Sequence, residues 1–328
     1  MGRRRLTVWA EAWPLARPFA IARGSVTQVT LFQAALTQAG RTGRGEARLY
    51  PRYGDSVAAF FAQAEDVRTA LEAGAGRKDL LTRLPAGGPR AALDAALWDL
   101  EAQLTGEPVW QRLGLSLPDA LPTAFTVSLA TPTAMAEAAG HAPGRVLKLK
   151  LGQSPRTDLE CIAAVAEARP DAQLILDANE GWDRDMLSRV RALNAPICLI
   201  EQPLPAGSDR DLPADPRLCA DESLSGEAAL AALPSGYGAI NVKLDKAGGL
   251  TAALDWVQTA QTRGLAVFLG CHVATSLAMM PALMLAPFCQ WIDLDGAWLL
   301  ARDRQPGLRY ANGCLQPAPG LWGAPRPF

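Results

Sequence analysis

The sequence predicts an α/β protein in which a parallel (β/α) barrel follows a smaller α+β module. With 328 residues, the chain is longer than one ordinary domain and long enough for both parts. From about Pro122 onward, short β-branched or leucine-rich runs alternate with alanine-rich helical stretches, which is the pattern of a parallel barrel. Residues 306–328 are rich in proline and glycine, and we expect this tail to pack back over the first module.

The region up to about Leu117 has a mixed pattern. Strands are expected over 7–11 and 27–37, and helices over 55–73 and 89–104. In the last of these, Ala92, Ala96 and Leu100 recur at the spacing of one buried helical face. Strands followed by helices indicate a separate α+β unit.

The later region supplies eight expected barrel strands. They are 123–129, 146–151, 174–179, 198–203, 218–223, 240–244, 267–271 and 291–295. The helices expected between them include 157–168, 183–193, 226–232, 250–263 and 275–285. The alternative is an open doubly wound sheet, which is disfavoured because no glycine-rich phosphate turn follows an early strand.

The composition indicates a globular protein and excludes several partners. With 49% apolar residues and a net charge of −1, the chain lacks a basic surface for nucleic acid or an anionic membrane. No run approaches the roughly 20 apolar residues of a membrane span, and Glu11 and Pro14 interrupt the stretch behind the basic N-terminus. Scattered cysteines favour a reducing cytoplasm, and two histidines are too few for a His-rich zinc site. The oligomeric state is left open, a homo-oligomer included.

Charged residues close six of the expected strands. They are Lys148 and Lys150, Asp177, Glu201, Asp221, Lys243, and Asp293 with Asp295. From Lys150 to Lys243, successive groups are 20 to 27 residues apart by their residue numbers, about one strand–helix unit each. In such barrels chemistry takes place where the strands end, and alternate residues of a strand share one side. We therefore expect these groups around one rim.

Three carboxylates, Asp177, Glu201 and Asp221, fall on successive strands of this rim, where they would repel one another. A hard divalent cation cancels that repulsion, and oxygen ligands favour Mg²⁺ over zinc. The alternative is three unrelated acids, each paired with a nearby lysine or arginine. We predict a magnesium site with positions left for water or substrate.

Two lysines, Lys150 and Lys243, flank these acids from opposite sides of the expected barrel mouth. A proton next to a carboxylate is too weakly acidic for an unaided base, but a metal on that carboxylate stabilises the enediolate that forms. Lys148 and the metal would lower the pKa of Lys150 toward the working pH. One lysine can then remove the proton and the other return it on the opposite face. Taken singly, Lys148 and Lys150 are also compatible with solvated lysines at a strand end.

These motifs resemble the enolase superfamily, and within it the muconate-lactonizing subgroup. The matching runs are Lys148-x-Lys150, Asp177-x-Asn179, Glu201-Gln-Pro, Asp221-Glu-Ser and Asn241-Val-Lys243. Gly45-Glu46 and the run from Ala91 to Asp99 resemble its capping domain, so the resemblance covers nearly the whole chain.

The resemblance implies a fold and a set of roles. The fold is a modified (β/α) TIM-type barrel over 119–300, with an N-terminal α+β capping domain over 1–118 that is completed by the C-terminal segment 301–328. The roles are Mg²⁺ binding by Asp177, Glu201 and Asp221, acid–base chemistry by Lys150 and Lys243, substrate contact by Lys148, and support of the metal site by Asn179.

Two further runs are similar to the dipeptide epimerases, especially those acting on L-Ala-D/L-Glu. They are Lys243-Leu-Asp-Lys-Ala-Gly-Gly-Leu and Asp293-Leu-Asp295-Gly. In that group the Asp-x-Asp pair holds the free ammonium of the dipeptide, and a buried ammonium does need carboxylate partners. Alternatively, the pair caps backbone amides or binds an arginine.

Further side chains are assigned to the expected substrate pocket. Arg23, in the first loop of the cap, matches where the family places a cation for the glutamate side chain, with Arg17 as the alternative. A solvated loop arginine is equally compatible. Where the family usually reads Gly-Cys-Met, this chain has Cys271 followed by His272, and we place both in the pocket. His272 could touch substrate or titrate near neutrality, and the alternative is a polar substitution in the wall of the pocket. His141 is expected in a surface loop.

The leading hypothesis is epimerisation of L-Ala-D-Glu and L-Ala-L-Glu, as in recycling of cell-wall peptides. Rivals on the same scaffold are N-acylamino acid racemisation, o-succinylbenzoate synthesis and muconate cycloisomerisation, whose substrates lack a free ammonium. Rivals of other classes are a Schiff-base aldolase that uses Lys150 or Lys243, and a non-catalytic binding protein on a barrel scaffold.

Overall fold

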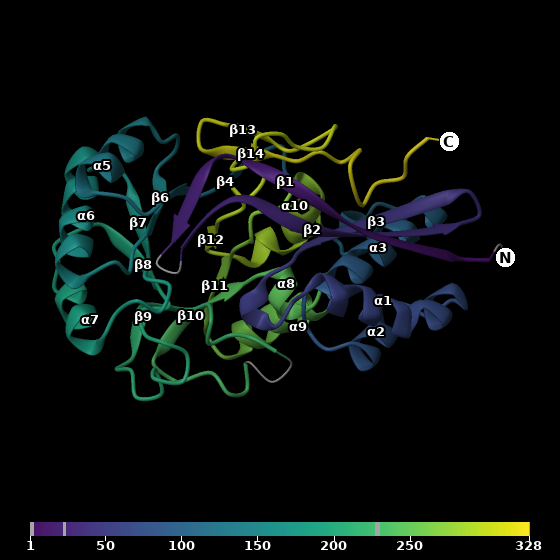
Figure 1. The fold of residues 1–328 in the computed structure, drawn as a ribbon, viewed down its shortest axis with the longest axis horizontal. Helices are drawn as coiled ribbons and strands as arrows, with labels where there is room; N and C mark the ends of the chain where they lie inside the picture. Colours follow the sequence, from purple (N-terminus) through teal and green to yellow (C-terminus); the bar gives the residue numbers. More distant parts are fainter. Residues whose placement is uncertain (1–2, 22–23, 227–229, 328) are drawn as a thin grey trace.

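The computed structural model describes residues 3–21, 24–226 and 230–327. Its chain forms an antiparallel sheet with helices beside a curled parallel sheet (Figure 1). The predicted class, a parallel barrel with a separate α+β module, is confirmed.

The first module is built on a three-stranded sheet of order β1-β2-β3. Its strands are β1 (Arg5–Ile21), β2 (Gly24–Gln38) and β3 (Arg41–Arg48). Its helical segments are η1 (Pro51–Tyr53), α1 (Val57–Glu72), α2 (Arg77–Arg83), α3 (Gly88–Thr105) and the short α4 (Val109–Arg112). The two expected strands and two expected helices are present, and β3 and α2 are additional.

Close approach of α3 to β3 depends on two glycines. A Cβ at Gly45 would collide with the carbonyl oxygen of Ala92, and one at Gly43 would collide with that of Ala96. Only hydrogen at these positions lets the helix backbone rest on the strand. The buried face of α3, which includes Ala92, Ala96 and Leu100, is the stripe predicted from its spacing.

The parallel sheet contains the eight predicted barrel strands in chain order. They are β5 (Phe125–Val127), β6 (Val146–Lys150), β7 (Gln173–Asp177), β8 (Ile197–Glu201), β9 (Asp215–Ala220), β10 (Tyr237–Val242), β11 (Ala266–Leu269) and β12 (Trp291–Ile292). The two edge strands meet where Ala124 N donates to Ile292 O at 2.7 Å. Alternation along the strands divides their side chains: Ile175 and Phe268 belong to the barrel interior, whereas Leu149 packs in the core formed with the helices.

Helices cover the outside of this curled sheet (Figure 1). They are α5 (Pro132–His141), α6 (Pro155–Ala168), α7 (Arg184–Arg191), α8 (Leu244–Ala247), α9 (Leu250–Thr262) and α10 (Ser276–Ala282), which continues into η2 (Leu283–Phe288). A small sheet of order β13-β14-β4 joins β4 (Leu121–Pro122), β13 (Arg309–Ala311) and β14 (Cys314–Gln316). Of the helix expected over 226–232, residues 227–229 lie outside the described part, and Leu230 begins a turn. His141 is exposed at the end of α5.

Several hydrogen bonds, the following three among them, join the module to the barrel and to the C-terminal segment. Asp94 on α3 accepts a hydrogen bond from Thr251 N at 3.0 Å. Leu129 N, beyond β5, donates to Ala20 O of the β1–β2 hairpin at 3.3 Å. Near the C-terminus, Trp322 Nε1 donates to Ala95 O on α3 at 2.9 Å. The exact domain boundaries at 118 and 300 stay a prediction.

None of the described helices has the length and apolar character needed to cross a membrane.

Candidate active site

Three carboxylates stand at the carboxyl ends of adjacent strands. Asp177 ends β7, Glu201 ends β8, and Asp221 directly follows β9. Asp177 and Glu201 are paired in register, so their side chains lie side by side. All three are almost completely buried, with exposures of 0%, 0% and 2%. The structure therefore brings the predicted acids to one rim.

Two lysines reach these acids from opposite sides. Lys150 ends β6 and donates to Asp177 Oδ2 at 2.5 Å. Lys243 follows β10 and donates to Asp221 Oδ2 at 2.6 Å. Because β7, β8 and β9 lie between β6 and β10 in the sheet, the two amines flank the three carboxylates.

A third lysine, Lys148, is buried at the centre of the site. Its Nζ lies 2.8 Å from Glu201 Oε2, 2.9 Å from Asp293 Oδ2 and 3.3 Å from Asp177 Oδ2. Burial opposes its charge, but the surrounding carboxylates, Asp293 foremost, hold the pKa of Lys148 well above its usual value. This side chain is a fixed positive charge beside the acids.

The carboxylates differ in their protonation because their neighbours differ. Burial raises the pKa of Glu201 to about 7, and the negative charge of Asp177 adds to that shift. Burial also opposes ionisation of Asp177, but Lys150 and Lys148 lower its pKa to about 2. For Asp221, Lys243 and Lys246 outweigh burial and hold the pKa well below the usual value. Glu201 is the member of the trio that lacks enough positive charge.

The donor set suits a hard divalent cation. It consists of oxygen atoms alone, and Glu201 Oε2 makes no hydrogen bond of good geometry within the described residues. In this structure the acids contact lysines, and no three His, Cys, Asp or Glu side chains of the described residues are already grouped around a metal position. Pairing with lysines alone leaves Glu201 with a raised pKa, caused by burial and by repulsion from Asp177, so these contacts favour further positive charge at the site.

Two supporting residues were not among the predicted site residues. Lys246, on α8, donates to the carbonyl oxygen of Asp221 at 2.6 Å and contacts its Oδ1 at 2.5 Å. Asn241, on β10, donates from Nδ2 to Glu201 Oε1 at 2.6 Å. Their spacing from Lys243 could have indicated them, because Lys246 lies three residues later, about one helical turn, and Asn241 lies two residues earlier, on the strand that Lys243 follows.

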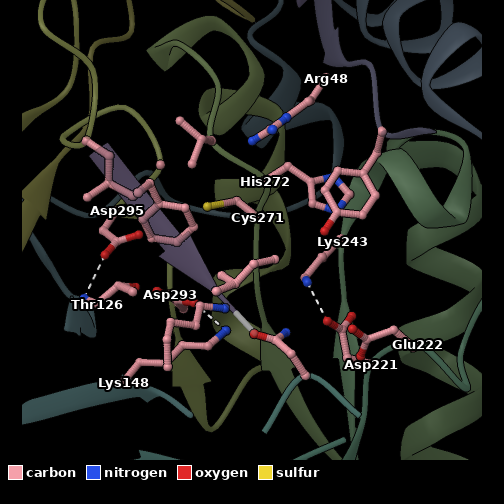
Figure 2. Close-up of a pocket in the computed structure, with 18 residues that line it drawn as sticks. Arg48, Thr126, Lys148, Asp221, Glu222, Lys243, Cys271, His272, Asp293 and Asp295 are labelled. Atoms are coloured by element: carbon pink, nitrogen blue, oxygen red, sulfur yellow. Dashed lines mark hydrogen bonds and ion pairs between the residues drawn. The ribbon is translucent and has the colours of Figure 1, made fainter. Parts of the chain in front are cut away.

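The predicted Asp-x-Asp pair lines the same pocket as the lysines (Figure 2). Asp293 Oδ2 accepts from Lys148 Nζ at 2.9 Å, and its buried Oδ1 makes no hydrogen bond within the described residues. Asp295 Oδ2 accepts from Thr126 N at 2.8 Å. Burial and the charge of Asp293 raise the pKa of Asp295 to about 7. The pair offers acceptors for a cationic group of a ligand.

His272 and Cys271 line the pocket wall, as predicted. His272 Nδ1 lies 2.9 Å from Asp245 Oδ2, and its ring stacks on Tyr50 with centroids 4.5 Å apart. Burial lowers the pKa of His272 to about 4 despite Asp245, which favours an uncharged ring in the pocket wall. Burial also raises the pKa of the Cys271 thiol well above its usual value, which leaves it uncharged.

The predicted arginines and Asn179 have different outcomes. Arg23 lies outside the described residues, and Arg17 is exposed on β1 and is not among the residues that line the pocket. Asn179 lines the pocket, and its backbone N donates to Asp177 Oδ1 at 3.0 Å. An arginine that was not predicted, Arg48 at the end of β3, does line it.

Comparison with known proteins agrees with this architecture. Residues 131–322 match the model of the enolase C-terminal domain-like family, and residues 3–114 match that of the mandelate racemase/muconate lactonizing enzyme N-terminal domain. The L-Ala-D/L-Glu epimerase of Escherichia coli K12 is 42% identical over 95% of this chain and 99% of its own. The N-acetyl-D-glutamate racemase of a Pseudoalteromonas species is 43% identical over 75% of this chain and 79% of its own.

Two solved structures share the fold. An enolase family member from Agrobacterium tumefaciens with homology to dipeptide epimerases, solved with sodium and L-Ala-L-Glu, superposes with a TM-score of 0.92 at 40% identity and covers 98% of this chain and 100% of that one. The dipeptide epimerase of Methylococcus capsulatus with Mg and L-Arg-D-Lys has a TM-score of 0.88 at 34% identity and covers 98% and 99%. The chain therefore belongs to the enolase superfamily, in the mandelate racemase and muconate-lactonizing group.

Proposed function

We propose that this enzyme is a Mg²⁺-dependent dipeptide epimerase that inverts the α-carbon of the second residue of L-Ala-D/L-Glu-type dipeptides. The observation that carries the proposal is the placement of Lys150 and Lys243 on opposite sides of three buried carboxylates. Epimerases among its relatives act on dipeptides, including an L-Ala-D/L-Glu epimerase at 42% identity.

In this proposal Asp177, Glu201 and Asp221 hold the Mg²⁺. When bound, the ion supplies the positive charge that stabilises the negative charge appearing on the substrate α-carboxylate as the α-proton leaves. The fixed ammonium of Lys148, in contact with the same acids, adds to the positive potential at that carboxylate.

Two amines carry out the proton transfer, one as base and the other as acid. The Nζ of one lysine takes the proton from the α-carbon, and the Nζ of the other gives a proton to the opposite face. A substrate lying above the carboxylates would have Lys150 on one side and Lys243 on the other, because these residues extend from β6 and from the end of β10. Delivery of its own proton by the second amine inverts the centre and leaves that amine neutral, so either isomer can be the starting material.

Asp293 and Asp295 orient the substrate in this proposal. The dipeptide's α-ammonium would take the acceptor positions of the pair, of which Asp293 Oδ1 makes no hydrogen bond within the described residues. That pairing separates a dipeptide from an N-acyl amino acid, which has no ammonium. N-acylamino acid racemisation is kept as the second candidate because the Pseudoalteromonas relative at 43% identity is such a racemase.

The proposed substrate suggests the cellular compartment in which the enzyme acts. We place the enzyme in the cytoplasm, where dipeptides released from cell-wall peptides would be recycled, and we leave open whether one chain or a homo-oligomer is the working form.

Deuterium exchange tests the proposal. The purified chain is incubated in D₂O with Mg²⁺ and either L-Ala-L-Glu or L-Ala-D-Glu, and mass spectrometry and NMR follow the glutamate α-position. We expect one deuterium there and convergence of both isomers to one mixture, with EDTA abolishing both effects. A preparation of Lys150→Met/Lys243→Met is the control for contaminating activity. Absence of exchange from both isomers would refute the proposal, whereas exchange that survives EDTA with borohydride trapping of a carbonyl substrate would indicate a Schiff-base aldolase.

A further inference from the structure

Arg48 is a further cation in the wall of the pocket. The pocket walls also carry Lys148, Lys150 and Lys243, and each of these lysines is within hydrogen-bond distance of a carboxylate. Arg48, in contrast, forms no ion pair with any described residue, and its buried Nε has no hydrogen-bond partner there. The guanidinium contact that the structure provides is with the ring face of Tyr50, whose centroid is 5.5 Å from Cζ.

The side chains around Arg48 contact one another. The negative charge of Asp245 attracts the Arg48 guanidinium. The Oδ2 atom of Asp245, however, lies 2.9 Å from Nδ1 of His272. The ring of His272 stacks on Tyr50 at an interplanar angle of 9°. His272 is uncharged at neutral pH, so it neither competes with Arg48 for an anion nor supplies a second cation. A half-buried arginine is costly to leave unpaired, which makes this position a candidate for binding an anionic group from outside.

The location of Arg48 matches the far end of a dipeptide. Figure 2 shows Arg48 on the side of His272 and Lys243, while Asp295 and Thr126 lie on the opposite side, with Cys271 between the two groups. A ligand whose ammonium lies at Asp295 and whose α-carbon lies between the catalytic lysines would extend its second side chain toward the Arg48 side. That side chain is the glutamate carboxylate in L-Ala-D/L-Glu.

We propose that Arg48 is the specificity-determining residue that receives the side-chain carboxylate of the dipeptide's second residue. This inference rests on the proposed function, because the position of the substrate α-carbon comes from it. A guanidinium offers two parallel N–H donors that match a carboxylate, and a neutral side chain of the same shape cannot use them fully. Arg48 would therefore select an acidic second residue over its amide.

This assignment competes with the arginine predicted from the first loop of the cap. Arg23 lies outside the described residues, and the exposed Arg17 is not among those lining the pocket. If Arg23 or Arg17 carries the selectivity, replacement of Arg48 will leave it intact. The two assignments are thus separated by which variant changes the preference for glutamate over glutamine.

The test compares L-Ala-L-Glu with L-Ala-L-Gln for the wild type, Arg48→Met and Arg48→Lys. Initial deuterium exchange gives kcat/KM, and calorimetric titration of each dipeptide in the presence of Mg²⁺ gives Kd. We expect Arg48→Met to lose roughly 10- to 150-fold in kcat/KM and affinity for the glutamate dipeptide, with little change for the glutamine dipeptide. Arg48→Lys should recover part of the loss. Arg44→Met is the matched control, since it removes a half-buried guanidinium from the same strand outside the pocket.

The outcomes separate the two proposals. Two results for folded Arg48→Met would overturn the role of Arg48: an unchanged ratio of kcat/KM for the glutamate and glutamine dipeptides, or an equal loss for both dipeptides. The role would also be overturned if that ratio is lost in Arg23→Met or Arg17→Met and kept in Arg48→Met. The binding measurement still decides if the wild type exchanges neither dipeptide, because a Glu/Gln difference in Kd that disappears in Arg48→Met supports Arg48 even where the epimerase proposal fails. Circular dichroism verifies folding, and Arg48→Gln replaces Arg48→Met if the latter does not fold.

Discussion

Replacing Asp295 with asparagine should separate dipeptide substrates from N-acyl amino acids. Asp295 is 4% exposed, and its Oδ2 accepts from Thr126 N, an interaction that an asparagine oxygen can keep. The neighbouring Asp293 already accepts from Lys148 at 2.9 Å, which leaves Asp295 as the member of the pair without a lysine contact. On the proposed function, we therefore expect Asp295 to be the main counterion for the substrate ammonium.

The expected magnitude follows from this burial. Removing one partner of a buried, hydrogen-bonded charge pair costs about 2–5 kcal/mol, or roughly 30- to 5,000-fold in kcat/KM. The raised pKa of Asp295, about 7, predicts that the carboxylate gains charge as pH rises from 6 to 8. Wild-type kcat/KM for L-Ala-L-Glu should improve over that range, and the asparagine variant should lose this part of the pH dependence.

The assay is deuterium exchange with L-Ala-L-Glu and, in parallel, with N-acetyl-L-glutamate. The reasoning predicts a large loss for the dipeptide and little change for the acetylated substrate, which has no ammonium. Equal losses for both substrates would indicate damage to the pocket, and no loss for the dipeptide would refute the role given to Asp295.

Three further predictions concern how the site is supported. Arg304→Met should lower the unfolding free energy by about 3–5 kcal/mol in chemical denaturation, because it leaves the buried Glu46 carboxylate without its arginine. Adding Glu46→Gln to this variant should recover part of the loss. Additive losses from the two substitutions would argue against the ion pair. Gly45→Ala should cost about 1–3 kcal/mol or more by forcing α3 off β3, whereas Gly140→Ala, which has open space, should cost little; equal melting temperatures would contradict this packing. Burial raises the pKa of Asp94 to about 6. The unfolding free energy of the wild type should therefore fall by roughly 3 kcal/mol relative to Asp94→Asn as pH rises from 3.8 through 6. Parallel curves of unfolding free energy against pH for the two proteins would contradict this prediction.

The rim was predictable because its signal is local. Six of the eight strands of the parallel sheet read as apolar runs closed by a charged residue, and parallel strands bring those ends to one edge. The in-register pairing of Lys150 with Asp177 and of Asp177 with Glu201 is what an unbroken series of strand–helix units produces. Alternation also placed Leu149 on the helix side of β6.

The place of Arg48 in the pocket wall, at the end of β3, was not predictable from such signals. β3 reads Arg-Thr-Gly-Arg-Gly-Glu-Ala-Arg, with two glycines and three arginines, and intrinsic strand preference disfavours it. It forms a strand because β2 pairs with it and α3 packs on its glycines, which are contacts between distant parts of the chain. The lowered pKa of His272 likewise depends on burial between distant parts of the chain, with Tyr50 stacked on its ring, and it persists despite the nearby Asp245.

The most direct test of the central claim is single-lysine exchange. Lys150→Met and Lys243→Met are each incubated in D₂O with Mg²⁺ and, separately, with L-Ala-L-Glu and L-Ala-D-Glu. Because the proposal places one amine on each side of the α-carbon, each variant should exchange deuterium into only one isomer, the two variants should act on opposite isomers, and neither should interconvert them. Exchange into the same isomer by both variants, or inversion by either one alone, would contradict two amines acting on opposite faces.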